Sequence, residues 1–505
     1  MNILENAIKV VSPGTALRRA QQRQALDIVT QSRGYDAASN GRRTNSFKGR
    51  STDVNAEIGP ALATLRNRSR DMCRNTPIGA RIVQTMTSHL VGNGIKIIWD
   101  TGSDASDRRV GALYEEFEST SDIEGETNYA GQQVLAARSM VEGGEVFGKF
   151  VDLRLDDYRT VPFAIKLFEG DQVAAGFDNF SKHKDTRLGV KLGEWDQRLG
   201  YWLYPQHPGA ADWRGANQPV LHDRESILHL YHGLRPGQLR GVPWMAPSLM
   251  TGRDLADLID AMVTKTRVEA CVTALVTGSD QGGGPENIGT TSKERPTDEK
   301  LAPGLIKYLP HGADVKVVSP SGTGQYETVW MTTMMMICAG AGVTYDQGTG
   351  DLRQANYSSL KAGKIELRRL VSQIQHVEFV PKFMARVTSR FLNRTQLAGL
   401  LPKRRDGYSH QYVMPVHEPI DPLKDLQADI LAVRAGAMSP QKFFATYGVD
   451  WRKMLTEFKQ FETATKDLDH DFAFDASKPT LKNNQITKEA VRHMDLSHLS
   501  SLLED

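Results

Sequence analysis

A segment in the middle of the chain has the spacing of a long helix, but its apolar residues form only a narrow stripe. Charged side chains such as Asp254, Asp257 and Arg267 fill the other faces. The apolar positions that recur at helical spacing are Leu249, Leu255, Leu258, Ile259, Met262, Val263 and Val268. The pattern predicts a helix over 246–277 that needs a partner along one side.

A second helix is predicted over 326–341, and four methionines within 331–336 give it a soft, adaptable apolar face. Between the two helices, 278–300 is rich in Gly, Ser, Thr, Pro and charge, which is typical of a mobile loop. Two short strands are predicted after it, at 305–309 and 314–318. We therefore expect a small inserted unit where the tips of the two helices meet.

The part of the chain before these helices mixes helix and strand. We expect a helix over 62–91, interrupted at Pro77 and with its arginines on the face away from the apolar side chains, and a helix over 130–142 that Gly143 and Gly144 end. A strand is expected at 95–99. Further short strands are expected at 146–151, 163–168, 188–192, 199–204 and 226–231. The fold class is therefore α+β.

After the second helix, 342–351 is too rich in glycine to be one helix, and we expect a flexible loop there. A strong amphipathic helix follows over 358–380, with Leu367, Val371 and Val377 on one side, and Pro381 is expected to kink or break it. A proline-rich connector leads to two helices near 424–435 and 440–447. Order beyond 465 is not expected.

Composition excludes several classes of protein. The 62 Lys and Arg residues nearly balance the 60 Asp and Glu residues, so the net charge of +2 gives the whole chain no strong attraction for polyphosphate. Cys73, Cys271 and Cys338 are far apart and fit neither a disulfide framework nor a zinc site, and we expect reduced cysteines in a cytoplasm. No apolar run approaches the ~20 residues of a membrane span, and no secretory signal is recognised.

No catalytic motif is found. The chain has no phosphate-binding G-x-x-x-x-G-K-[ST] loop and no G-x-S-x-G elbow, and His417 does not begin a zinc-protease motif. His229 and His232 have a ligand-like spacing, but residues three apart on a strand point to opposite faces, so we interpret both as structural. The acidic run after Asp467 lacks the glycine and glutamate of a calcium loop. We predict no catalytic residue, no metal and no cofactor.

Six short motifs, spread over most of the chain, resemble the lambda-type portal protein family of tailed bacteriophages. Any one of them is weak, but their order along the chain is a strong signal. They are Leu65–Asp71 with Arg74–Pro77, Val91–Ile95, Glu142–Phe147, His229–Pro247 with Arg235–Gln238 and Arg240–Pro243, Gly340–Tyr345 with Asn356–Ser359, and Ile420–Pro422.

The resemblance implies a portal fold that assembles as a cyclic ring, a dodecamer, at one capsid vertex. It implies a basic N-terminal arm (1–55), an α/β wing (56–245), a first stem helix (246–277), a clip (278–322), a second stem helix (323–341), a channel loop (342–357), a long kinked helix with a return to the wing (358–414), a helical crown (415–465) and an acidic tail (466–505). Neighbouring subunits would then cover the narrow apolar stripes of the stem helices.

The resemblance also implies a function and partners. The ring would package and eject double-stranded DNA, bind the terminase large subunit and then a head-completion adaptor, contact the major capsid or scaffolding protein, and avoid membranes. It would reside in the virion, and in the host cytoplasm during assembly. Candidate residues for transient DNA contact are Gln347, Arg353, Gln354, Asn356 and Tyr357, although Asn356–Ser359 could equally serve to cap a helix. Candidates for partner docking in the clip are Lys293, Glu294, Arg295, Asp298 and Glu299.

Two other classes of protein were weighed against this one. An enzyme, either a metal-dependent nuclease or a phage head protease, would need a nucleophile or a metal cluster, and the sequence has no recognisable one. A helical scaffold or adaptor would have little β structure, whereas 146–231 is rich in predicted strands.

Overall fold

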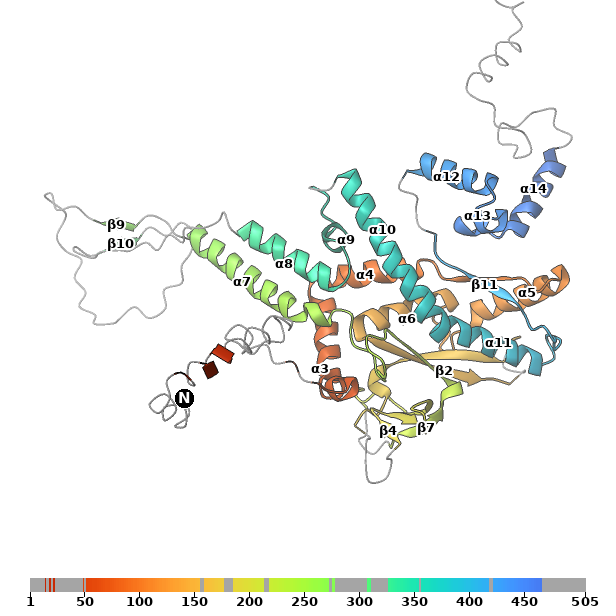
Figure 1. Ribbon diagram of the computed structural model, residues 1–505, viewed down its shortest axis with the longest axis horizontal. Coiled ribbons are helices and arrows are strands. Elements are labelled where there is room, and N and C mark those ends of the chain that lie inside the picture. The colour runs from red at the N-terminus through yellow and green to blue at the C-terminus, as the bar shows by residue number, and fades with distance from the viewer. Residues whose placement is uncertain are drawn as a thin grey trace, which may run out of the picture.

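The protein is described from a computed structural model, which covers residues 51–154, 159–176, 185–212, 218–271, 275–277, 307–309, 326–353, 356–416 and 421–465, with a few isolated positions before 50. Within these ranges, helices and short sheets are mixed (Figure 1). This confirms the mixed helix-and-sheet class. No described helix is both long and apolar enough to cross a membrane.

Two consecutive helices begin the described chain, α3 (Val54–Asn75) and α4 (Pro77–Val91). The predicted interruption at Pro77 is confirmed, because Thr76 caps α4 and Pro77 occupies its first turn, where a missing N–H costs nothing. The prediction that the arginines of α3 face away from the core was wrong for Arg66, which is buried. Its guanidinium is held by carboxylates from distant parts of the chain.

The next elements are β1 (Lys96–Trp99), α5 (Asp104–Thr120) and α6 (Tyr129–Gly143). The sequence predicted β1 and α6 but missed α5, although Val110, Tyr114 and Phe117 bury one of its faces. Helix α6 ends as expected, with Gly144 in the left-handed conformation. Strand β1 pairs antiparallel with β11 (His410–Val413), which lies more than 300 residues later in the chain. This pairing brings an early and a late part of the chain together in the compact region that we call the body.

Two antiparallel sheets form the centre of the body. One has the order β3-β2-β8, with bounds Phe163–Glu169, Glu145–Asp152 and Ile227–Tyr231, and the other has the order β4-β5-β6-β7, with bounds Thr186–Arg187, Val190–Leu192, Arg198–Leu203 and Val220–Asp223. All five strands expected here are confirmed, whereas β4 and β7 were not predicted. The main core includes Met86, Met140, Leu228 and Phe383. It lies where α4 and α6 meet the first sheet.

Short 3-10 turns interrupt the chain at Gly170–Gln172, Arg224–Ser226 and Ala246–Ser248. The last of these leads into α7 (Leu249–Cys271), which lies beside α8 (Tyr326–Gly340). The pair extends away from the body (Figure 1). The prediction that the first helix reaches residue 277 was wrong, because 275–277 form strand β9, parallel to β10 (Lys307–Leu309). The predicted strand at 314–318 lies outside the described residues.

A nearly continuous run of helical turns follows α9 (Tyr345–Thr349). It consists of α10 (Tyr357–Ile374), the π-helical segment η6 (Gln375–Met384) and α11 (Ala385–Leu397). At Pro381, where a kink or break was expected, the regular α-helix gives way to η6, whose wider π turn relieves the clash of the proline ring with the preceding turn. Val377 is exposed, so its predicted place on the apolar side was wrong.

Three helices end the described chain: α12 (Pro422–Arg434), α13 (Pro440–Thr446) and α14 (Trp451–Thr465). The first two were predicted and the third was not. None of the described side chains in these helices is fully buried. Leu431, Leu455 and Phe461 are among their exposed apolar side chains.

Candidate functional sites

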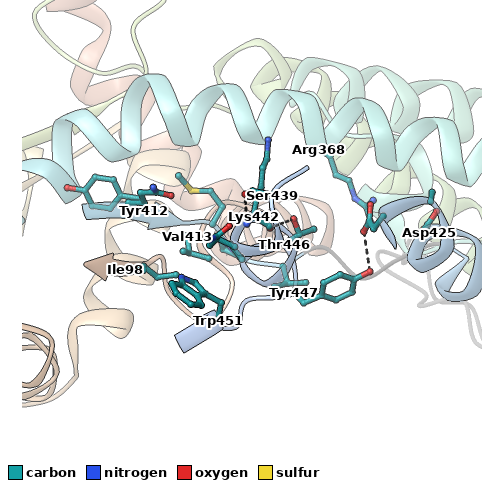
Figure 2. A pocket seen from close by; sticks show the side chains of 18 of the residues that line it. Ile98, Arg368, Tyr412, Val413, Asp425, Ser439, Lys442, Thr446, Tyr447 and Trp451 are labelled. Atoms are coloured by element: carbon teal, nitrogen blue, oxygen red, sulfur yellow. Dashed lines mark hydrogen bonds between the residues drawn. The ribbon is translucent and has the colours of Figure 1, made fainter. Parts of the chain in front are cut away.

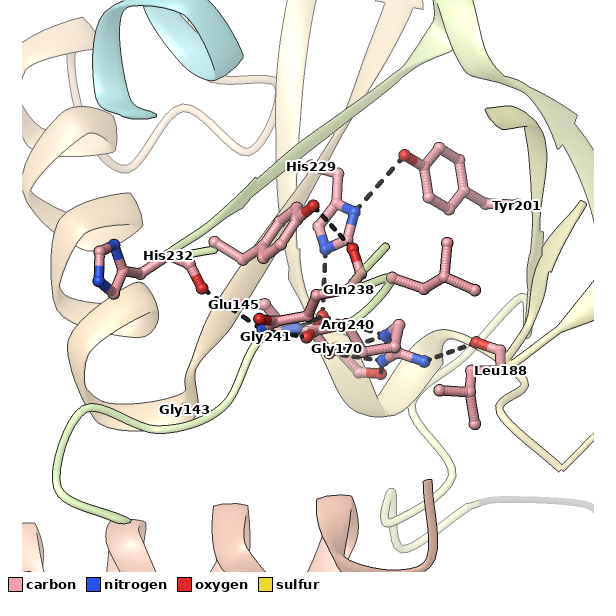
Figure 3. Close-up of polar contacts among 12 residues, drawn as sticks. Gly143, Glu145, Gly170, Leu188, Tyr201, His229, His232, Gln238, Arg240 and Gly241 are labelled. Atoms are coloured by element: carbon pink, nitrogen blue, oxygen red, sulfur yellow. Dashed lines mark hydrogen bonds and ion pairs between the residues drawn. The ribbon is translucent and has the colours of Figure 1, made fainter. Parts of the chain in front are cut away.

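Three of the motifs found in the sequence meet at one buried carboxylate, Glu145. Figure 3 shows Glu145 with His229 and Arg240. Arg240 Nη2 lies 2.5 Å and Arg66 Nη2 lies 2.7 Å from its Oε1 atom, and His229 Nε2 lies 3.1 Å from its Oε2 atom. All four side chains are at most 3% exposed. We name Glu145, Arg66, Arg240 and His229 the Glu145 cluster.

The backbone is shaped around this cluster. Gly241 donates its N–H to Glu145 Oε2 at 2.9 Å, and Arg240 donates to the carbonyl oxygens of Gly170 and Leu188. Gly144 has a φ of 89°, and a Cβ there would lie 2.5 Å from the Pro243 nitrogen. A Cβ on Gly241 would overlap the Gly144 carbonyl oxygen. The two glycine-containing motifs therefore need glycine because their backbones touch.

The charges of the cluster are fixed by its contacts. Burial by itself would raise the pKa of Glu145, but Arg240, His229 and Arg66 together hold that pKa far below its usual range. Burial lowers the pKa of His229 to about 3, against an opposing effect of Glu145. At neutral pH the cluster thus contains one carboxylate, two guanidiniums and a neutral imidazole. The carboxylate is enclosed by donors, so it suits a structural role better than acid–base catalysis.

The cluster anchors the segment that leads into α7. Residues 233–248, which we name the strap, connect β8 to α7 and carry Arg240. Farther along the strap, the Trp244 indole N–H donates to the Ala341 carbonyl at 2.7 Å, and the Ser248 hydroxyl donates to the Ile337 carbonyl at 2.9 Å. One end of the strap is thereby bound to the sheets and the other to the C-terminal end of α8. The strap fixes how the helix pair leaves the body.

The structural interpretation of the two spaced histidines is consistent with their contacts. His229 faces Glu145, whereas His232 stacks on Trp244 and lies 3.6 Å from Glu378. The two rings are thus held by different carboxylates, as expected for residues that point to opposite faces.

A different group has the composition of a metal site. Within the described part of the chain, ligand atoms of Glu169, Asp171 and His207 lie within 4.8 Å of one another. However, Arg66 and Arg70 lie 3.1 Å and 2.8 Å from Asp171, and Arg70 also pairs with Glu169 at 3.0 Å. Two guanidiniums already supply the positive charge that a cation would bring. We interpret the group as a polar network around Arg70.

The predicted channel loop is more ordered than expected. Residues 345–349 form α9, and Gly348 is buried against Cys338, where a Cβ would overlap the sulfur atom. The half-buried side chain of Gln347 accepts the backbone N–H of Thr344 at 3.0 Å, which completes a capping box. The backbone carbonyl oxygen of Gln347 accepts a hydrogen bond from the Thr85 hydroxyl. The expectation of a uniformly flexible loop was therefore wrong, because packing against α4 and α8 outweighs the glycine content.

The other candidate DNA-contacting residues are placed as follows. Arg353 is 73% exposed and pairs with Asp351 at 2.7 Å. The Asn356 side chain accepts the Ser359 N–H at 2.8 Å and caps the N-terminus of α10, so the structure shows the capping role that the sequence left open. Tyr357 is the first residue of α10, but its side chain lies outside the described part of the structure. Gln354, and the clip residues Lys293, Glu294, Arg295, Asp298 and Glu299, also lie outside the described residues.

The α7–α8 pair exposes apolar side chains that a monomer has no reason to keep. On α7, Ile259 and Val263 are exposed, and on α8 the exposed set is Val329, Met335 and Met336, of which Met336 is 61% exposed. Among the described side chains of the pair, the buried apolar ones lie at its base and include Leu255, Ile337 and Cys338. Such a row is typical of a surface that another protein covers.

Comparisons with known proteins point to one protein family. Residues 40–375 match the family described as phage portal protein, lambda family. A probable portal protein of Halomonas phage phiHAP-1 is 24% identical over 79% of this chain and 80% of its own length. The portal protein of Escherichia phage N15 is 21% identical over 81% of this chain and 85% of its own. Portal protein B of Escherichia phage lambda is 20% identical over 83% and 86%.

Among solved structures, a chain in the neck of an empty gene transfer agent particle aligns with a TM-score of 0.42 and 16% identity, over 77% of this chain and 93% of that chain. All three of these phage relatives carry the name of a portal protein. The family match spans most of the chain and includes five of the six motifs. The chain belongs to the lambda family of phage portal proteins.

Proposed function

We propose that this portal protein assembles into a closed cyclic ring of about a dozen copies that conducts double-stranded DNA into and out of a capsid. The observation that carries the proposal is the α7–α8 pair, which leaves the body with uncovered apolar side chains on both helices. In a ring, each pair lies between two others, so a head-to-tail interface that closes on itself covers the exposed row in every copy.

The proposed division of the chain is the one that the resemblance to the portal family implies. Residues 56–245 would be the wing, α7 and α8 the stem, 278–322 the clip and 415–465 the crown, with an arm at 1–55 and a tail at 466–505. Residues 342–357 would line the narrowest part of the channel, and 358–414 would return the chain to the wing. The strap then acts as the joint between wing and stem, and the Glu145 cluster holds it.

Particular residues are proposed for two contacts of the ring, one with DNA and one with its partner proteins. Of the channel candidates whose side chains the structure describes, exposed Arg353 is the best placed to meet DNA, although it would have to give up or share its ion pair with Asp351. Gln347 and Asn356 are already used as helix caps, so their contact with DNA would be secondary. In the clip, Lys293, Glu294, Arg295, Asp298 and Glu299 would meet the terminase large subunit and then the head-completion adaptor, while the major capsid or scaffolding protein holds the ring in the vertex.

Native mass spectrometry tests the ring and its proposed interface. The purified chain should appear as one large closed oligomer over several salt concentrations. Met336→Glu places a charge on the exposed face of α8 and should shift the protein to monomers. Trp195→Glu, which alters an 85% exposed side chain in the turn between β5 and β6, is the matched control and should leave the oligomer intact. A monodisperse monomer of the unaltered chain, or an intact oligomer of Met336→Glu, would contradict this interface.

A further inference from the structure

A groove runs between α10 and the crown helices, and one end of it is lined by positive charge. Two adjoining cavities make up the groove, of about 1090 Å³ and 470 Å³, and they share the segment 413–416, Arg368 and Tyr447. Figure 2 shows Arg368 of α10 and Lys442 of α13 at the larger cavity. We name the two cavities together the α10 groove.

The smaller cavity contains cations and no acid. Its lining includes Lys96 from β1, Lys364 and Arg368 from α10, and His89 from the C-terminal end of α4, with no Asp or Glu. Within the described part of the chain, neither Lys96 nor Lys364 forms an ion pair with a carboxylate. Burial, and then Arg368 and Lys364, lower the pKa of His89, as expected where positive charge is concentrated.

The cations of α10 form a row. Lys364 and Arg368 are spaced at i and i+4, share one face of the helix and both line the smaller cavity. Four residues of α-helix extend about 6 Å. One strand of DNA carries a phosphate about every 3.4 Å along the helix axis, so these two cations face about two successive phosphates, and Lys96 adds a third cation to the same cavity. A single small anion would use only part of this row, whereas a polymer of phosphates fits its length.

The acidic residues of the groove lie at its other end. Asp100, Asp425 and Asp429 line only the larger cavity, where Asp100 lies 3.5 Å from Arg452 and Asp429 accepts the Tyr447 hydroxyl. An acidic or apolar protein segment would contact both ends, whereas a phosphate backbone would be directed to the end without carboxylates. The charge distribution favours the nucleic acid.

We propose that the basic end of the α10 groove, formed by Lys96, Lys364 and Arg368, binds consecutive phosphates of a DNA backbone, as a contact separate from the channel loop. The choice of DNA as the source of the phosphates rests on the proposed function. The contact is with phosphates only, so it carries no preference for base sequence.

Lysine acetylation, read by mass spectrometry on the assembled full-length protein, tests this site. A duplex of about 40 base pairs should reduce the acetylation of Lys96 and Lys364 several-fold, and about 1 M salt should restore it, because counterion release makes such contacts salt-dependent. Lys166, half-exposed on β3 and paired with Glu124, is the internal control and should not respond. Inorganic phosphate at the same phosphate concentration should give no protection.

A pair of charge-reversal variants gives a second measurement. Lys364→Glu with Arg368→Glu should lower the slope of log affinity for DNA against log salt by about 0.9 for each phosphate that the variant protein no longer neutralises. Arg108→Glu with Arg109→Glu, at two exposed positions of α5, makes the same change in net charge and is the control. Native mass spectrometry of each sample shows whether the ring has formed, so failure of the ring is distinguished from failure of the site.

Three results would overturn the proposal. In the first, both lysines react equally with and without DNA in an intact ring. In the second, they are already unreactive in the ring without DNA, which would mean that a neighbouring subunit covers the groove. In the third, inorganic phosphate protects them as well as DNA does, which would mean that the site binds a free anion.

Discussion

The Glu145 cluster allows a quantitative prediction, because removing its single negative charge leaves two guanidiniums buried around it. In Glu145→Gln the side chain keeps its shape, but an NH2 donor replaces one of the two oxygen acceptors. The groups around it, which include Arg66, Arg240 and the Gly241 N–H, are themselves donors. Arg66 retains Asp171 at 3.1 Å, whereas Glu145 is the only described carboxylate that pairs with Arg240. Breaking a buried pair by removing one partner costs about 3–5 kcal/mol. This is a large part of the ~5–15 kcal/mol that stabilises a typical domain.

Urea unfolding, combined with hydrogen exchange of the β2 peptide, measures this loss. The matched control is Glu57→Gln, which removes the same charge from a pair with Arg235 at 2.9 Å in which both side chains are 49% exposed. A pair of that kind contributes less than about 1 kcal/mol. We expect Glu145→Gln to shift the unfolding midpoint strongly and to speed exchange in β2, and Glu57→Gln to do neither.

A double variant separates the loss of the pair from the loss of packing. Glu145→Leu and Arg240→Met together remove both charges and retain apolar volume, so their combined cost should be clearly less than the sum of the two single costs. If Glu145→Gln unfolds at the same urea concentration as Glu57→Gln, the cluster does not stabilise the fold and the reasoning from burial fails.

Three further predictions follow from particular contacts. Gly241→Ala should prevent stable folding, since its Cβ would overlap the Gly144 carbonyl, whereas Gly176→Ala has nothing within 4 Å of its Cβ and should be tolerated; equal melting temperatures would contradict the close approach. Asn356→Ala should cost about 1 kcal/mol by removing the cap of α10, seen as faster hydrogen exchange in its first turn, and unchanged exchange would argue against the cap. The pKa of His229 falls from 6.5 to about 3 on folding, so between these two pH values only the unfolded chain gains this proton. The free energy of unfolding should therefore decrease as the pH falls from 6.5 to about 3, and this decrease should be smaller in His229→Gln. The same pH profile for the variant and the unaltered protein would contradict this.

The sequence predicted helices and strands well where the apolar residues recur at one clear spacing, either that of a helix or that of a strand. The five strands of 146–231, the break at Pro77 and the end of α6 at Gly144 all depend on neighbours a few residues away, and these are confirmed. The prediction of helix through residue 277 failed because the short apolar run Leu275–Thr277 fits either a helix or a strand, and its partner β10 lies 30 residues farther along.

The Glu145 cluster could not be assembled from the sequence, because its parts lie 79 and 95 residues from Glu145 along the chain. Arg66 is four residues after buried Leu62 and three before buried Ser69, so its place on the buried face of α3 can be read from the helical spacing, but only the fold brings a carboxylate to it. The motifs of the family include the segments that form the cluster, but they do not show that these segments contact one another at Glu145. The channel loop shows the opposite error, since its glycines indicated flexibility although Gly348 is required for close packing.

Electron cryomicroscopy of the purified protein, without DNA or any other protein, tests the central claim most directly. The account predicts closed rings with cyclic symmetry and a central hole wide enough for duplex DNA, in which the α7–α8 pair of each copy packs against those of its neighbours. Discrete monomers or dimers, open filaments, or rings in which the exposed faces of α7 and α8 remain uncovered would contradict it.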